Sequence, residues 1–271
     1  MWVVQYRQYQ YPAGLKVIRF DQHLRAVFDK VPDPPPMGTP GLDKITVHED
    51  TNGDGTYDKH KEVISNLNIA TSVQVGKGGI WVLNPPYLLR YPDANRDDVP
   101  DGDPEVHLSG FGLQDTHSVA NSLLWGPDGW LYFTMGNTWV KPNAPKPIRD
   151  LQGIKSNDKT QYPLTKVYTK ETYPKSFHPL NKQEMEGGIF RCRPGGYDLE
   201  LFARGMRNPW DMCMDSGFNW LATDNDPGRP GERIFMPIQH GHYSMRHPWK
   251  FDWMGKHIAV APSSDLFPSV S

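Results

Sequence analysis

The stretch Gly126-Pro127-Asp128-Gly129-Trp130-Leu131-Tyr132-Phe133 joins a tight polar turn to an apolar strand with tryptophan at or next to its first position. Two other places repeat this arrangement: Gly76-Lys77-Gly78-Gly79 before Ile80-Trp81-Val82-Leu83, and Asp215-Ser216-Gly217 before Trp220-Leu221-Ala222-Thr223. Gly and Asp favour such turns because they accept unusual backbone angles or hydrogen-bond the local backbone. We interpret the three tryptophan strands as the same strand of a repeated unit, and Trp2-Val3-Val4 as that strand in a preceding unit.

Further strand-like runs surround each turn, so that each unit holds four short strands. They include residues 45–49 and 62–73, then 88–91 and 105–110, then 188–192 and 200–205. Four-stranded units of about 40–50 residues are typical of propeller blades. Unrelated antiparallel strands in a sandwich are the alternative. The turn and the tryptophan recur together in all three units, which favours an all-β propeller.

The repeat predicts a single propeller domain over residues 1–271, with two loop insertions at about 11–41 and 141–186. The first insertion is rich in proline and the second in Lys, Pro and Thr. Neither is periodic, so we expect loops over a face or an edge. About three blades with fragments of a fourth and fifth are visible, so we expect an incomplete propeller whose open edge needs missing blades or a partner.

Charge and hydropathy exclude several classes of protein. The formal net charge is −2, which gives no basic footprint for nucleic acid. No run of 18 apolar residues occurs, so no membrane span is expected, and no signal peptide is visible. Because the chain opens on a strand, we expect the natural N-terminus to lie upstream. Cys192 and Cys213 form either one disulfide or two inert core thiols, and we favour the thiols.

Strand geometry predicts where polar groups gather. The turn at 126–129 closes one end of its hairpin, so the flanks Asp115-Thr116-His117 and Gly136-Asn137 must meet at the opposite end. The same reasoning brings Met206-Arg207-Asn208 to Asp224-Asn225-Asp226-Pro227, and Asn68 to Asn84-Pro85-Pro86. Polar groups that converge on one face are the default location of a site.

Two acidic loops have the spacing of calcium ligands. In the first, oxygen-bearing side chains alternate along Asp50, Asn52, Asp54 and Asp58, with Gly55 where an EF-hand loop needs a sharp turn. The position of the final glutamate holds Lys61, and strands flank the loop, so this is a calcium loop inside a blade. The second loop repeats the pattern with Asp98 in place of the glycine and with the ligand positions Asp93, Asn95, Asp97 and Asp101. The alternative in both places is a solvated acidic turn.

The ordered set of motifs resembles a known family. The run from His117 through the turn at 126–129 to Tyr132, the segment Gly205-Met206-Arg207-Asn208-Pro209-Trp210 and the loop at 224–227 are similar to segments of the soluble glucose/sorbosone dehydrogenases. The sequence between Ile45 and Trp130 more closely resembles the "membrane-bound dehydrogenase" propellers of planctomycete-type bacteria. The likeness covers most of the chain outside the second insertion.

The resemblance implies a six-bladed, TolB-like propeller that binds pyrroloquinoline quinone (PQQ) and Ca²⁺ and oxidises a sugar or other alcohol. His117 would be the general base, because imidazole exchanges protons near neutral pH, while hydride passes to the quinone. Arg207 would contact the anionic cofactor and, as a second catalytic residue, stabilise the negative charge that develops on the quinone. Asn208, also at the cofactor, would orient neighbouring groups, and carbonyls near Asp226 and Pro227 would hold Ca²⁺. A periplasmic or secreted location and an electron acceptor such as a cytochrome c domain follow from the same likeness.

Other interpretations stay open at this point. His117 could be a hydrogen-bonded turn residue, and Arg207 could simply pair with Asp224 or Asp226. The pair His240 and His242, with His247, lacks a third placed metal ligand. The chain could also be a non-enzymatic, calcium-stabilised propeller that binds carbohydrate or protein, or a lactonase that uses metal-bound water. A propeller fold does not choose among these functions.

Overall fold

The computed structural model describes residues 1–20, 26–113, 115–136, 146–147, 187–195, 198–225, 233–241, 243 and 259–262. Within these ranges the regular elements are strands, and no helix occurs. No helix in this part of the chain is therefore of the length and apolarity that crossing a membrane requires.

Three sheets each contain a four-stranded antiparallel meander that follows chain order. Blade 2 consists of β6 (Ser72–Gly76), β7 (Gly79–Asn84), β8 (Tyr87–Pro92) and β9 (Glu105–Ser109), with β12 (Lys146–Pro147) added outside β9. Blade 3 consists of β10 (Ala120–Trp125), β11 (Leu131–Met135), β13 (Gly187–Cys192) and β14 (Glu200–Met206). Blade 4 consists of β15 (Pro209–Met214), β16 (Trp220–Asp224), β17 (Arg233–Phe235) and β18 (Ala259–Pro262).

The first sheet has three strands. Blade 1 consists of β1 (Trp2–Gln5), β4 (Asp43–Glu49) and β5 (Lys59–Leu67). The pairing of β1 with β4 matches that of β7 with β8, so β1 takes the place of the second strand of a blade. This agrees with the prediction that Trp2-Val3-Val4 is equivalent to the other tryptophan strands.

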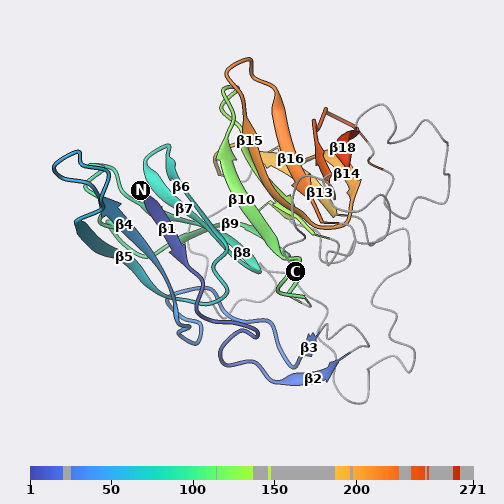
Figure 1. The fold of residues 1–271 in the computed structure, drawn as a ribbon. Coiled ribbons are helices and arrows are strands. Elements are labelled where there is room, and N and C mark those ends of the chain that lie inside the picture. The colour runs from blue at the N-terminus through green and yellow to red at the C-terminus, as the bar shows by residue number, and fades with distance from the viewer. Residues whose placement is uncertain are drawn as a thin grey trace.

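The blades stand side by side like the segments of a fan, as Figure 1 shows from the blue sheet of β1 to the orange sheet of β15. The first strands of successive blades are neighbours, because β6 contacts β10 and β10 contacts β15, and β1 also contacts β6. First strands that meet side by side are the arrangement of a propeller. The predicted all-β propeller is confirmed, and the described residues form four blades of it.

An apolar layer lies between each pair of neighbouring blades, and alternate residues of one strand contribute to the layers on its two sides. On β7, Ile80 and Val82 face the layer shared with blade 1, whereas Trp81 and Leu83 face the layer shared with blade 3. On β11, Phe133 faces blade 2. Side chains alternate between the two faces of a strand. A strand buried on both faces is therefore apolar throughout, as the six buried residues of β7 are.

One glycine is required by the contact between blades 2 and 3. Gly76 has φ +148°, and a Cβ there would lie 2.7 Å from the indole nitrogen of Trp125. The ring of Trp125 meets that of Trp81 edge to face, with centroids 5.6 Å apart. The turn at 76–79 is thus fixed by backbone conformation and by the tryptophan of the next blade.

The first insertion is more ordered than predicted. We expected loops, but β2 (Val17–Phe20) and β3 (Ala26–Phe28) form a hairpin, which lies apart from the four blades in Figure 1. Ala26 and Phe28 pack with Leu113, which lies in the connection between β9 and β10. The hairpin therefore contacts the loop that leads to His117. Of the second insertion, the described residues are Lys146 and Pro147 of β12.

A buried histidine in blade 2 makes stability depend on pH. His107 is 4% exposed and packs on Trp81, and its Nε2 lies 3.1 Å from Glu105. Burial lowers the pKa of His107 below its ordinary 6.5, and the Glu105 carboxylate opposes this only in part. In the unfolded chain this imidazole takes up a proton near pH 6.5, whereas in the folded protein it stays neutral to a lower pH. The free energy of unfolding therefore falls as the pH drops below 6.5.

We predict that the free energy of unfolding is smaller at pH 5.5 than at pH 7.5, and that His107→Phe reduces this difference. Urea denaturation of both proteins at the two pH values measures it. His60→Gln, which changes an exposed histidine of β5, should leave the difference as it is. An equal pH dependence in His107→Phe and wild type would show that His107 is not its source.

Candidate functional site

The loops that join successive blades meet the second-to-third-strand loops at one end of the sheets. Asn68 donates its backbone N–H to Oδ1 of Asn84 at 2.8 Å. Asn208 donates its backbone N–H to Oδ1 of Asp224, also at 2.8 Å. Gly136 lies against Asn208 and Ser118. These three pairings agree with the strand geometry, while Asn137 lies outside the described residues.

His117 is held from both sides of its ring. Its Nδ1 lies 2.9 Å from Oδ1 of Asp115, and its backbone N–H donates to the same oxygen at 3.0 Å. Its Nε2 is hydrogen-bonded to the hydroxyl of Tyr9. The side chain is 59% exposed. Because a carboxylate can only accept, the network assigns the imidazole proton to Nδ1 and leaves Nε2 as an acceptor.

Asn208 connects blades 3 and 4 at this site. It is 7% exposed, and its Nδ2 donates to the carbonyl of His117 at 2.8 Å. Its Oδ1 is buried and has no hydrogen-bond partner among the described residues. A Cβ at Gly136 would come within 2.7 Å of that oxygen, so the site requires glycine there. An orphaned buried acceptor is costly in a folded protein, which marks this position as a functional candidate.

Arg207 is half-buried and faces the loop after β16. Its Nη1 donates to the carbonyl oxygen of Asn225 at 3.1 Å and to its Oδ1 at 2.9 Å. Asp224 accepts the backbone N–H of Arg207, at 3.1 Å. The guanidinium of Arg207 therefore contacts Asn225, whereas the contact of Arg207 with Asp224 is made by its backbone N–H. Asp226 and Pro227 lie outside the described residues.

Sequence reasoning missed the segment that carries Tyr9. The backbone N–H groups of Arg7 and Gln8 both donate to Oδ1 of Asp43 at 2.5 Å, and Ala70 donates to its Oδ2 at 2.7 Å. Asp43 is fully buried, and this burial raises the pKa of its carboxyl, while the backbone donors act in the opposite direction. A single aspartate at the start of a strand gives no sequence signal of such a role.

The two acidic loops are close copies of one another. Asn52 Nδ2 donates to Asp54 Oδ2 at 3.0 Å, and Asn95 Nδ2 donates to Asp97 Oδ2 at the same distance. The N–H of Asp54 donates to Asp50 Oδ1 at 3.2 Å, and that of Asp97 donates to Asp93 Oδ1 at 3.2 Å. Thr51 and Ala94 likewise donate their N–H groups to Asp58 and Asp101.

Hydrogen bonds within the first loop lower the pKa values of its carboxyls. The main cause is the N–H of Gly55 for Asp50, the N–H of Thr56 for Asp54, and the hydroxyl of Thr51 for Asp58. Yet no three His, Cys, Asp or Glu side chains in the described part of the chain converge as metal ligands. A cation in these loops would therefore require carboxylates to turn from N–H groups towards the ion. His240 is exposed, and His242 and His247 lie outside the described residues.

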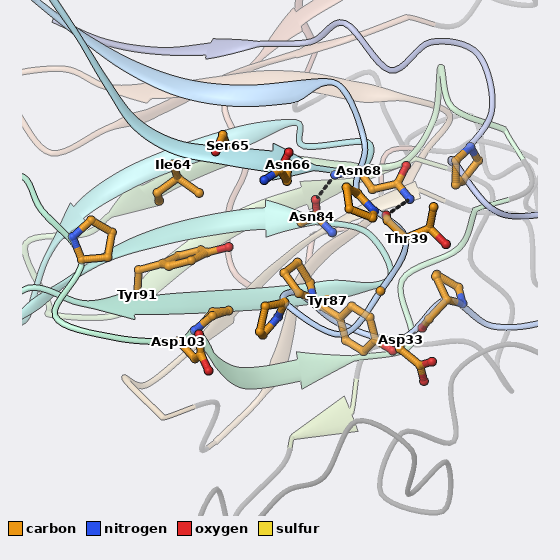
Figure 2. Close-up of a pocket in the computed structure, with 18 of the residues that line it drawn as sticks. Asp33, Thr39, Ile64, Ser65, Asn66, Asn68, Asn84, Tyr87, Tyr91 and Asp103 are labelled. Atoms are coloured by element: carbon orange, nitrogen blue, oxygen red, sulfur yellow. Dashed lines mark hydrogen bonds between the residues drawn. The ribbon is translucent and has the colours of Figure 1, made fainter.

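A separate cavity of about 260 Å³ lies between blades 1 and 2. Its walls combine prolines of the first insertion, the edge strand β5, and Tyr87 and Tyr91 of β8. Figure 2 shows the hydroxyl of Tyr91 pointing into this space. Burial, followed by the negative charge of Asp103, raises the pKa of Tyr91 above its ordinary value. Asn68 closes one end by donating to the carbonyls of Ala13 and Thr39, at 3.1 and 3.4 Å.

The two cysteines are free, so the disulfide alternative is wrong. They lie in different blades, on β13 and β15. Burial raises the pKa of Cys192 to about 12, as expected for an inert core thiol. Cys213 is exposed, which corrects the prediction that both thiols are in the core.

Comparison with known proteins gives a family and several similar structures. Residues 1–161 match the family described as "Domain of unknown function (DUF7133)". No curated protein matches the sequence at a significant level. A solved putative oxidoreductase (glucose dehydrogenase) of Thermus thermophilus is similar, with 14% identity, a TM-score of 0.34, and coverage of 90% of this chain and 67% of that one.

A second similar structure is the PQQ-bound form of aldose sugar dehydrogenase from Streptomyces coelicolor. It has 12% identity and a TM-score of 0.40, with coverage of 90% of this chain and 66% of that one. The chain thus spans about two thirds of the length of each of these two proteins.

Proposed function

The chain belongs to the DUF7133 family, and we propose that its propeller carries the active site of a PQQ- and calcium-dependent dehydrogenase that oxidises a sugar or another alcohol. The observation that carries this proposal is the pairing of Asp115 with Nδ1 of His117, which leaves Nε2 able to accept a proton at an exposed position. A general base needs this arrangement and access to the hydroxyl that it deprotonates.

The residues around His117 support this role. Asp115 holds the imidazole in the required tautomer and stabilises the imidazolium that forms when Nε2 takes the proton of the substrate hydroxyl. Asn208 fixes the backbone of His117 through its carbonyl. Two hydrogen bonds with Asp115 in its own loop and one from Asn208, in the connection between blades 3 and 4, therefore position His117.

Two described residues fit the quinone, Arg207 as a donor to its anionic groups and Asn208 as an acceptor. Arg207 directs two N–H contacts from Nη1 to Asn225, and a planar guanidinium has three further N–H groups on Nε and Nη2 that can bind carboxylate oxygens. The orphaned Oδ1 of Asn208 lies at the same end of the blades and, as an acceptor, would pair with a donor group of the quinone and not with its carboxylates. Arg207 and Asn208 would therefore hold the quinone. When bound, the quinone supplies a two-electron acceptor.

Calcium belongs to the proposal through the two acidic loops. Their side chains are oxygen donors at alternate positions, which suits a hard ion, and the two loops share one hydrogen-bonding pattern. A structural role follows from their place, since each loop joins the outer two strands of a blade. Calcium use would suit a location outside the cytoplasm, and reoxidation would require an electron acceptor such as a cytochrome c domain.

We predict that the protein, with calcium present, binds PQQ saturably, that Arg207→Ala weakens binding at least tenfold, and that His117→Ala binds PQQ but no longer reduces it when sugar is added. Absorbance titration measures both steps.

Arg193→Ala serves as a matched control, because Arg193 stacks on Trp130 with its guanidinium carbon 4.1 Å from the ring centroid, at the opposite end of blade 3. Absence of saturable PQQ binding would contradict the dehydrogenase proposal. Turnover of a lactone without an electron acceptor would show that the protein is a hydrolase instead.

For the loops, we predict that Ca²⁺ raises the melting temperature by about 5–10 °C when free calcium is a hundred times Kd. Asp54→Ala should remove much of this rise, because it deletes a central oxygen donor. Thermal denaturation with Ca²⁺, with Mg²⁺ and with chelator measures the effect. Asp198→Asn, a change of an exposed acid outside both loops, should keep the full response. An identical melting temperature with Ca²⁺ and with chelator would rule out structural calcium.

The cavity between blades 1 and 2 favours a second candidate function, the binding of carbohydrate without catalysis. Tyrosine and proline faces pack against the apolar faces of a sugar ring, and Tyr91, Asn66 and Asp103 offer polar groups to its hydroxyls. The volume of about 260 Å³ suits one sugar ring rather than a long chain.

We predict that, under this second function, a saccharide binds with Tyr91→Phe two- to tenfold weaker than wild type, since one hydrogen bond is lost. Calorimetry with a panel of mono- and disaccharides measures the affinity. Arg207→Ala should leave this affinity unchanged because Arg207 does not line the cavity. If saccharide affinity drops in Arg207→Ala and not in Tyr91→Phe, sugar binds at the face that holds His117.

A further inference from the structure

The hydroxyl of Tyr9 occupies the one ring nitrogen of His117 that is able to accept a proton. Tyr9 Oη is hydrogen-bonded to Nε2, and the two rings meet edge to face with centroids 5.5 Å apart and planes at 82°. Since Nδ1 is engaged by Asp115, Nε2 accepts and Tyr9 donates. A neutral imidazole has a single lone pair at that nitrogen, so it accepts one hydrogen bond there.

The segment around Tyr9 is anchored on both sides, which holds the phenol in this place. On one side Asp43 binds the N–H groups of Arg7 and Gln8. On the other side Ala13 donates its N–H to Oδ1 of Asn68 at 2.8 Å. The segment thus starts at blade 1 and reaches the loop before blade 3, across the end of the sheets where the site lies.

Tyr9 itself is not part of the core. Tyr9 is 55% exposed. Among the described residues its ring contacts one further aromatic ring besides His117, that of Tyr6, edge to face with centroids 6.0 Å apart. Its hydrogen bond to His117 is therefore made in contact with solvent, where such bonds are worth little net free energy. The anchors fix the backbone, while the phenol can leave Nε2 without disturbing packed layers.

We propose that Tyr9 is a placeholder for the substrate hydroxyl and thereby a specificity-determining residue: it shields Nε2 of His117 in the free protein and is displaced by an alcohol whose hydroxyl donates to the same nitrogen. A phenol O–H and an alcohol O–H present the same donor to the imidazole, so the two compete for one lone pair. Alcohols that also bind elsewhere on the face displace Tyr9, and weakly held alcohols do not. The kinetic part of this inference rests on the proposed function of His117, whereas the shielding does not.

The test uses the full chain and diethyl pyrocarbonate, which acylates the free nitrogen of a neutral imidazole. Mass spectrometry of peptides gives the modification rate of His117, with the exposed His60 as an internal reference. Tyr9→Phe removes only the hydroxyl and should raise the rate at His117 by about two- to tenfold, the range expected for one exposed hydrogen bond. Tyr11→Phe, the same change two residues later where the ring packs on Phe28, should leave the rate unchanged. Equal rates in Tyr9→Phe and wild type overturn the proposal.

The second readout is steady-state oxidation of a sugar by the protein loaded with PQQ. Tyr9→Phe should lower KM by about two- to tenfold with little change in kcat, because substrate no longer competes with the phenol. A lower kcat at unchanged KM would overturn the placeholder role and make Tyr9 part of the chemistry. If no alcohol is oxidised, the dehydrogenase proposal fails, and a raised modification rate in Tyr9→Phe still supports the shielding of His117.

Discussion

The burial of the middle strands on both faces is the constraint on which the rest of this structure depends. On β7, alternate residues fill two different apolar layers, one shared with blade 1 and one with blade 3. A shift of one residue in the register of such a strand would exchange the two layers, so the register is strongly specified. Because the registers are fixed, the ends of the strands are also fixed, and the loops at one end are brought to defined positions. The tight contact of Trp125 with Gly76 shows how closely neighbouring blades approach.

Polar side chains at the strand ends then determine how the loops of the site are arranged. Asn84 and Asp224 stand at the ends of β7 and β16. Asn84 accepts one backbone N–H, and Asp224 accepts two, from the loop that enters the blade to which each of them belongs. Asp43 does the same for the segment before β2 and for Ala70. Each of these groups satisfies buried backbone donors that a turn would otherwise leave unpaired. The candidate base is therefore positioned by a network that begins in the blades, and its own contacts with Asp115 and Asn208 complete it.

The two acidic loops and the site lie at opposite ends of the blades, since the loops join third to fourth strands and the site joins fourth strands to first ones. Calcium in the loops would therefore stabilise the outer strands without touching His117. This separation is why the function of the site and the role of the ion can be examined one at a time.

The repeat of turns and tryptophans determined the all-β propeller from the sequence alone, because alternate burial and tight turns leave a local signal that recurs with each blade. Strand geometry also determined that His117, Asn208 and Asn68 face the same end, since a hairpin places its flanks opposite its turn. Only the tertiary structure decided that Tyr9 meets His117, that Asp43 anchors the segment of Tyr9, and that the first insertion contains a hairpin. The contacts of Asp43 and Tyr9 join residues 35 to 108 positions apart, outside the repeat, through side chains whose partners no local pattern specifies. The two cysteines are near in sequence but belong to different blades, because blade 3 ends at β14, before the chain reaches Cys213 on β15.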